Sequence, residues 1–126
     1  MGYQGALIVD ECATDAVAIR DLVAEHEIPA KVARTAEHAL LEFSRTRPAF
    51  LFVHLNLPGV IDGWELLEVL NQEGYLDHTL AVALTAHDHP GVEETALAEG
   101  FAAYLTKPLD AERVQQTLED LLPVRV

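Results

Sequence analysis

Three short, uninterrupted apolar runs constrain the fold of this chain more than any other feature. They read ALIV at residues 6–9, AFLFV at 49–53 and LAVAL at 80–84. Runs of this length without alternation are typical of strands that are buried on both faces of a parallel sheet. Two weaker runs, AKVA at 30–33 and AAYL at 102–105, also fit strands. We therefore predict a sheet of five parallel strands.

The segments between these runs have the spacing of amphipathic helices. Strands that alternate with helices imply right-handed crossovers and a doubly wound α/β sheet with helices on both faces. The chain of 126 residues is long enough for one core, so we expect a single domain over residues 1–126. The predicted helices contain Ala16, Ile19, Leu22 and Val23; Ala39, Leu40 and Phe43; Leu66, Leu67 and Leu70; the segment from Val92 to Glu99, ended by Gly100; and Ala111, Val114, Leu118 and Leu121 after the N-cap residue Asp110.

The formal net charge of −13 limits the classes of partner. An acidic surface repels phosphate backbones and anionic lipids, so we expect neither direct nucleic-acid binding nor membrane binding. The longest uninterrupted apolar runs, such as 49–53, are much shorter than a bilayer-spanning segment. The single cysteine, Cys12, excludes an internal disulfide and suits a reducing compartment. We expect a cytoplasmic protein whose partner is another protein.

Polar residues follow or end four of the predicted strands. Asp10 and Glu11 follow the first strand, His54 ends the third, Thr85 follows the fourth and Lys107 follows the fifth. In a doubly wound sheet, the functional crevice lies beyond the carboxyl ends of the strands. Carboxylates hold Mg²⁺, and hydroxyl and ammonium groups bind phosphoryl oxygens. These residue types are therefore suited to handling a phosphoryl group, and His54 is expected to contact the acidic pair.

The motifs LIVDE, LNLPG, DGWELL, ALTAH and YLTKP resemble, in this order and spacing, those of the response regulator receiver domain of two-component signalling. The resemblance covers essentially the whole chain and implies the flavodoxin-like, CheY-like fold. It also implies a protein partner, either a histidine kinase or an output domain. In the family, the kinase phosphorylates an aspartate four residues before the proline of LPG, and this position is His54 here.

The resemblance implies roles for the other residues at the strand ends. One departure lies beside them, because three residues separate Pro58 from Asp62 where the family usually has two, and we expect a reshaped loop. The implied roles are a degenerate metal-binding set for Asp10, Glu11 and Asn56, rim positions for Asn56 and His87, a switch hydroxyl for Thr85, a switch aromatic ring for Tyr104, a phosphate-binding lysine for Lys107 and a cis proline for Pro108.

A histidine at the acceptor position changes the expected chemistry. A neutral imidazole is a poor ligand for Mg²⁺, and the lost carboxylate no longer contributes negative charge to the ion. We expect weak or absent Mg²⁺ binding, no catalytic residue and no enzymatic activity. The sequence therefore favours a pseudo-receiver in a phosphorelay that acts by protein–protein interaction, with a homodimer through Val92 to Leu122 as one arrangement.

Two other interpretations remain open at this stage. In the first, the domain is a phosphorylatable receiver whose acceptor aspartate was replaced by His54. In the second, it is a metal-responsive binding domain, in which His54, His87 and His89 with Asp10 and Glu11 hold a transition metal such as Zn²⁺ or Ni²⁺.

Overall fold

The computed structural model of the chain describes residues 3–121 and contains a five-stranded parallel sheet. The strand order is β2-β1-β3-β4-β5, and all neighbouring strands are parallel. This arrangement confirms the predicted doubly wound α/β fold, and each predicted strand overlaps an observed one. The strands are β1 (Tyr3–Val9), β2 (Ala30–Ala33), β3 (Pro48–His54), β4 (Leu80–Thr85) and β5 (Ala103–Thr106).

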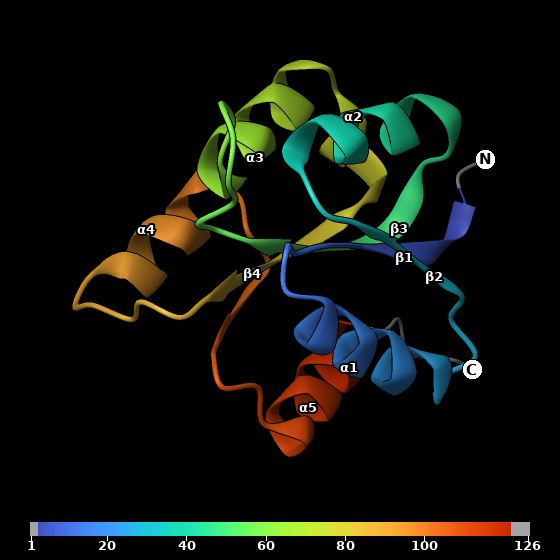
Figure 1. Cartoon of the computed structure of the whole chain (residues 1–126), viewed down its shortest axis with the longest axis vertical. Helices are drawn as coiled ribbons and strands as arrows, with labels where there is room; N and C mark the ends of the chain where they lie inside the picture. Colours follow the sequence, from blue (N-terminus) through green and yellow to red (C-terminus); the bar gives the residue numbers. More distant parts are fainter. Residues whose placement is uncertain (1–2, 122–126) are drawn as a thin grey trace.

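Five α-helices connect the strands and cover both faces of the sheet. Figure 1 shows the sheet nearly edge-on, with α1 and α5 on one side and α2 and α3 on the other. A short 3₁₀ helix, η1 (Tyr75–His78), lies between α3 and β4 and was not predicted. The helices are α1 (Ala13–Ala24), α2 (Ala36–Arg45), α3 (Gly63–Gln72), α4 (Val92–Glu99) and α5 (Ala111–Leu121). None of the described helices has the length and apolarity that crossing a bilayer requires.

The sheet separates two apolar clusters, which explains the uninterrupted apolar runs of the sequence. Leu7 and Val9 of β1 belong to the cluster under α2, α3 and α4, whereas Ala6 and Ile8 belong to the cluster under α1 and α5. Successive side chains of a strand point to opposite faces. Because both faces are covered here, each residue of the buried run 6–9 is apolar.

Side chains at the helix ends fix the connections near the strand ends. The Asp62 carboxylate accepts a hydrogen bond from the Glu65 backbone N–H, and the Glu65 side chain accepts one from the Asp62 N–H, which forms a capping box for α3. The predicted N-cap residue Asp110 accepts from the Glu112 N–H at the start of α5. Gly100, with φ of 119°, ends α4 as predicted.

Candidate functional site at the carboxyl edge of the sheet

The strand register brings the predicted site residues to one edge of the sheet. Val9 pairs with Val53, His54 with Leu84, and Thr85 with Thr106, so β1, β3, β4 and β5 end at nearly the same level. The residues at or just after these ends are Asp10, Glu11, His54, Thr85 and Lys107. Lys107 is tied to β4 because its N–H donates to the Thr85 carbonyl at 2.7 Å, and the peptide bond from Lys107 to Pro108 is cis, as the resemblance implied.

The start of α3 packs directly against the end of β3. The Gly63 N–H donates to the Leu55 carbonyl at 2.9 Å. A Cβ atom on Gly63 would lie 2.5 Å from the His54 carbonyl oxygen, which is closer than any side chain tolerates. The Asp-Gly pair thus has a structural role: Asp62 caps the helix, and Gly63 lets the helix approach the backbone of His54.

His54 is buried and contacts the acidic pair, as the sequence predicted. Its Nδ1 atom lies 2.7 Å from Glu11 Oε1 and 3.6 Å from Asp10 Oδ1, and the residue is 8% exposed. Partial burial of Glu11 opposes the charged carboxylate, but the hydrogen bond with His54 and several smaller favourable interactions together outweigh burial and hold the pKa of Glu11 below its ordinary value. The ends of β1 and β3 are therefore joined by a direct contact between side chains.

Lys107 lies between two carboxylates at the same edge. Its Nζ atom is 2.7 Å from Asp10 Oδ2 and 2.8 Å from Asp15 Oδ2. Burial raises the pKa of Asp10 although Lys107 and the Cys12 N–H stabilise its charge. The hydrogen bond from Lys107 lowers the pKa of Asp15. Burial opposes the charge of Lys107, but the two carboxylates raise its pKa above the ordinary value.

Asp15 is a member of this cluster that the sequence analysis missed. It lies in the first turn of α1, five residues after Asp10, and not at a strand end. A carboxylate in the first turn of a helix is common because it interacts favourably with the helix dipole. The sequence alone therefore gave no signal that separated Asp15 from an ordinary residue of a helix start.

The half of the edge built by β4 and β5 is held by hydroxyl groups. The buried Thr85 hydroxyl accepts a hydrogen bond from the His87 N–H at 2.9 Å, and the Tyr104 hydroxyl donates to Asp88 Oδ1 at 2.8 Å. Burial and the neighbouring Asp88 carboxylate raise the pKa of Tyr104 to about 12. Both contacts fix the loop between β4 and α4, and Asp88 is a second residue that the sequence analysis missed.

The geometry of this edge agrees with what comparisons with known proteins find. A family model for the response regulator receiver domain matches residues 6–119. The chain belongs to this family. A protein of Leptolyngbya boryana is 31% identical over 104 residues, which cover 82% of this chain and 79% of that protein. The nitrogen assimilation regulatory protein NtrX of Azorhizobium caulinodans is 28% identical over 109 residues, which cover 86% of this chain.

The relatives differ in how much of their length this receiver domain spans. The chain spans 24% of NtrX but 96% of the polar-differentiation response regulator DivK of Brucella anthropi, to which it is 27% identical. Among solved structures, the chemotaxis response regulator CheY4 of Vibrio cholerae has a TM-score of 0.84 at 21% identity, over 94% of this chain and 98% of that one. A receiver domain of a Francisella response regulator has a TM-score of 0.83 at 24% identity, over 94% and 95% of the two chains. These structures confirm the fold.

The Mg²⁺ ion that the receiver family implies does not fit the donor atoms of this edge. The end of β3 offers the His54 imidazole and not a third carboxylate. The nearest oxygen of Glu11 is engaged with His54, and one oxygen of Asp10 is engaged with Lys107. Mg²⁺ requires hard oxygen ligands in near-octahedral geometry, and a ring nitrogen is a poor substitute. The side chains at this edge therefore do not provide the set of oxygen ligands that Mg²⁺ requires.

The residues at the rim of the edge are exposed and lie outside the group of possible metal ligands. Asn56, His87 and His89 are exposed and line, with Thr85 and Trp64, a hollow of about 330 Å³. Within residues 3–121, the grouped metal-binding side chains are Asp10, Glu11 and His54, whose ligand atoms lie within 4.8 Å of one another. His87 and His89 are not part of this group, because the loop after β4 places both on the solvent-exposed rim.

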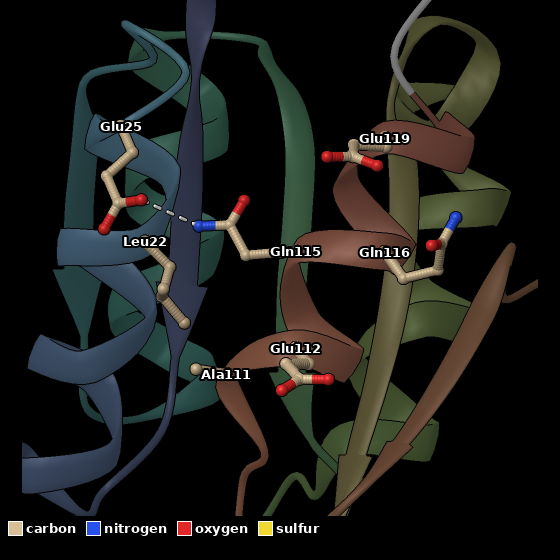
Figure 2. A pocket seen from close by; sticks show the side chains of 7 residues that line it. All are labelled: Leu22, Glu25, Ala111, Glu112, Gln115, Gln116 and Glu119. Carbon is tan, nitrogen blue, oxygen red and sulfur yellow. Dashed lines mark hydrogen bonds between the residues drawn. The ribbon is translucent and has the colours of Figure 1, made fainter.

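A larger hollow of about 480 Å³ lies away from the carboxyl edge, between α1 and α5 (Figure 2). Glu25, Glu112 and Glu119 line it, and Leu22 and Gln115 project toward it from the two helices. Gln115 links the helices, since its Nε2 atom donates to Glu25 Oε1 at 3.0 Å and its Oε1 atom lies 2.6 Å from His26 Nε2. None of the predicted site residues contributes to this hollow.

Proposed function

We propose that this receiver domain is a pseudo-receiver, which takes part in two-component signalling without phosphorylation at the end of β3. One observation carries the proposal: His54 occupies the end of β3 and its Nδ1 atom lies 2.7 Å from Glu11. An acyl phosphate requires an acceptor carboxylate, and an imidazole does not supply one. The acidic residue that would hold a metal ion in a relative is here engaged by the side chain of His54.

The charge pattern of the cluster supports the same proposal. In a phosphorylated receiver, cations must neutralise both the acidic pair and the transferred phosphoryl group. Here Lys107 is already shared between Asp10 and Asp15 at 2.7 and 2.8 Å. The lysine is thus already held by two carboxylates of the domain itself.

We propose that the domain transmits its signal by binding another protein, either a histidine kinase or an output domain, and that it does so in the cytoplasm without acting as an enzyme. The face of α4, β5 and α5, residues 92–122, is the proposed surface; Leu122 lies outside the described residues. This face combines an exposed apolar residue, Leu97 at 45%, with the exposed carboxylates of Glu93 and Glu94. A partner with basic residues around an apolar contact complements it.

A homodimer through the same face is the alternative use of this surface. Size-exclusion chromatography with light scattering at increasing protein concentration measures it. A mass that stays monomeric favours a different protein as the partner, whereas a dimer that Leu97→Glu dissociates assigns the surface to self-association.

The first test of the pseudo-receiver is phosphorylation with acetyl phosphate and Mg²⁺. We expect intact mass spectrometry, at low temperature and at neutral to basic pH, to find no added phosphate. Acyl phosphates and phosphohistidine both survive under these conditions. A stoichiometric increase by one phosphate in the unaltered chain contradicts the proposal.

The second test restores the missing carboxylate with His54→Asp. The introduced carboxylate would attack the phosphorus of acetyl phosphate, and acetate would leave. We expect this variant to gain Mg²⁺ binding and slow labelling, because Asp10, Glu11, Thr85 and Lys107 remain at the same edge. His54→Asn is the matched control, since asparagine has nearly the same shape as aspartate but lacks the charged acceptor oxygen. This variant should not be labelled.

The rate of labelling separates the pseudo-receiver from its rival. Slow labelling of His54→Asp agrees with a domain that has diverged from phosphoryl transfer. If the variant is labelled as rapidly as an ordinary receiver, a phosphorylatable receiver whose aspartate was replaced becomes the better description. If it gains neither Mg²⁺ binding nor labelling while folded, the edge has lost the family's chemistry at positions besides His54.

A further inference from the structure

Three potential metal ligands from two strands meet at the carboxyl edge. The Nδ1 atom of His54 is 2.7 Å from Glu11 Oε1 and 3.6 Å from Asp10 Oδ1, and all three ligand atoms lie within 4.8 Å of one another. In a tetrahedral zinc site with bonds of about 2.0–2.2 Å, neighbouring ligand atoms are about 3.3 Å apart. The two observed distances bracket this value, so a small shift of the side chains suffices to surround an ion.

The His54 ring is incompletely satisfied as it stands. Its Nε2 atom is buried and has no hydrogen-bond partner among residues 3–121. The side chain is nine-tenths buried, and Nδ1 is its only ring atom with a polar contact to this part of the chain. A buried polar atom without a partner is rare in native proteins and is commonly explained by a water molecule. An ion held by Nδ1 would not contact Nε2, because the two nitrogens point away from different sides of the ring, and Nδ1 is the atom that faces the two carboxylates.

The two oxygens of Asp10 have separate partners. Oδ2 contacts Lys107, whereas Oδ1 faces His54 and accepts a hydrogen bond from the Cys12 N–H at 3.0 Å. The cluster contains three carboxylates, Asp10, Glu11 and Asp15, and one ammonium group, that of Lys107, which contacts Asp10 and Asp15. A divalent cation between Asp10, Glu11 and His54 balances the remaining two negative charges.

We propose that this edge binds a first-row transition-metal ion such as Zn²⁺ in place of Mg²⁺, through His54 Nδ1, Asp10 Oδ1 and Glu11 Oε1. A mixed set of imidazole nitrogen and carboxylate oxygen suits Zn²⁺, which accepts nitrogen ligands at four-coordinate sites. Three protein ligands leave a fourth position for water or for a side chain of the protein partner. The inference deepens the proposed function, because it names what occupies this edge in the absence of phosphorylation.

The direct test is isothermal titration of the untagged chain with ZnCl₂ and, separately, with MgCl₂. We expect one Zn²⁺ per chain and no measurable Mg²⁺ binding at the same concentrations. His54→Gln should weaken Zn²⁺ binding at least tenfold, and His54→Asp should reverse the preference towards Mg²⁺. Glu11→Gln removes a second ligand without changing the buried β3 position, and it should also weaken Zn²⁺ binding at least tenfold.

Histidines outside the cluster provide the controls. His87→Gln with His89→Gln removes the exposed pair on the rim, and His78→Gln removes a histidine of η1; both variants should bind Zn²⁺ as the unaltered chain does. Bound Co²⁺ gives a second readout, since its visible absorption spectrum reports the ligand geometry and should change in His54→Gln.

The outcomes are distinct from those of the phosphorylation test. Absence of stoichiometric Zn²⁺ binding, or binding that survives both His54→Gln and Glu11→Gln, overturns the metal proposal and leaves the pseudo-receiver untouched. Loss of Zn²⁺ binding in the rim variant also overturns it and assigns the ion to His87 and His89. Phosphorylation of the unaltered chain contradicts the pseudo-receiver whatever the result with Zn²⁺.

Discussion

The two halves of the carboxyl edge differ in the groups that hold them together. In the half at the ends of β1 and β3, charged and ionisable side chains contact one another: His54 contacts Glu11, and Lys107 contacts Asp10. In the half at the ends of β4 and β5, neutral hydroxyl groups bind the following loop, through Thr85 to the His87 N–H and through Tyr104 to Asp88. The first half is a charge cluster, and the second is a set of loop contacts.

This difference shows how a receiver fold can change at one position. A substitution at the end of β3 alters the charge balance among the side chains beside it, because these interact at 2.7–3.6 Å. The hydroxyl contacts of Thr85 and Tyr104 are made to the loop after β4 and do not involve His54. The contacts at the ends of β4 and β5 can therefore remain while the charged residues at the ends of β1 and β3 change.

The largest expected effect on stability is the loss of the cation from the charge cluster. Lys107→Met leaves Asp10, which is fully buried, without its ammonium partner, and should lower the free energy of unfolding at neutral pH by about 3 kcal/mol. Urea unfolding followed by circular dichroism measures the change.

Lys31→Met is the matched control for this prediction, since it removes the other lysine of the chain. The Lys31 side chain is half-exposed and lies 3.5 Å from Glu42. Because the Lys31 side chain is half-exposed to water, loss of this pair should cost less than about 1 kcal/mol. Equal losses for the two variants would mean that the charge cluster adds no more stability than a surface ion pair does.

A smaller effect is expected from the loop contacts of the second half. Tyr104→Phe keeps the buried ring but removes the hydrogen bond to Asp88, and should cost about 1 kcal/mol of unfolding free energy. Tyr75→Phe is the control, because the described contacts of Tyr75 are ring contacts with Phe43 and Arg47, which the substitution keeps. If Tyr104→Phe costs no more than Tyr75→Phe, the hydroxyl does not fix the loop after β4.

Alkaline pH should affect the second half through the same hydroxyl. The pKa of Tyr104 is raised from 10.0 to about 12, so the stability from its neutral form is fully present below pH 10 and is lost as the pH rises through about 12. Absorbance titration of phenolate should resolve one tyrosine that ionises near pH 12. This late step should be missing in Tyr104→Phe, and a step that remains in this variant belongs to another tyrosine.

Acid pH should affect the first half, with the smallest change of the series. The pKa of Glu11 is lowered from 4.5, so the stability that its charged form contributes is present above pH 4.5 and is lost as the pH falls through the folded-state value. Glu11→Gln should therefore destabilise the domain near neutral pH, and the difference from the unaltered chain should shrink as the pH falls below 4.5. Urea midpoints over this range measure it, and a difference that does not change with pH would assign the loss to packing.

Asp10 gives the opposite sign within the same cluster. Its pKa is raised by burial, so its charged form is disfavoured in the folded domain, and protonation at low pH relieves this cost. Opposite trends for Asp10→Asn and Glu11→Gln between about pH 6 and pH 3 would show that the two carboxylates of the acidic pair are not equivalent.

The sequence by itself determined the strands, the helices and most of the edge. Uninterrupted apolar runs predicted strands buried on both faces, and Asp10, Glu11, His54, Thr85 and Lys107 were located from their positions at strand ends. This worked because the carboxyl ends of parallel strands converge on one edge whatever the details of packing. The family motifs then assigned a role to each of these residues, and these roles remain predictions.

Only the tertiary structure decided which of these groups contact one another. Asp15 joins Lys107 because the first turn of α1 lies beside the edge, and Asp88 meets Tyr104 because the loop after β4 comes within hydrogen-bonding distance of this side chain of β5. His87 and His89, in contrast, remain on the exposed rim although their distance along the chain from Thr85 is short. Contacts between side chains depend on rotamers and loop paths over a few ångströms, and strand-end positions in a sequence do not specify these.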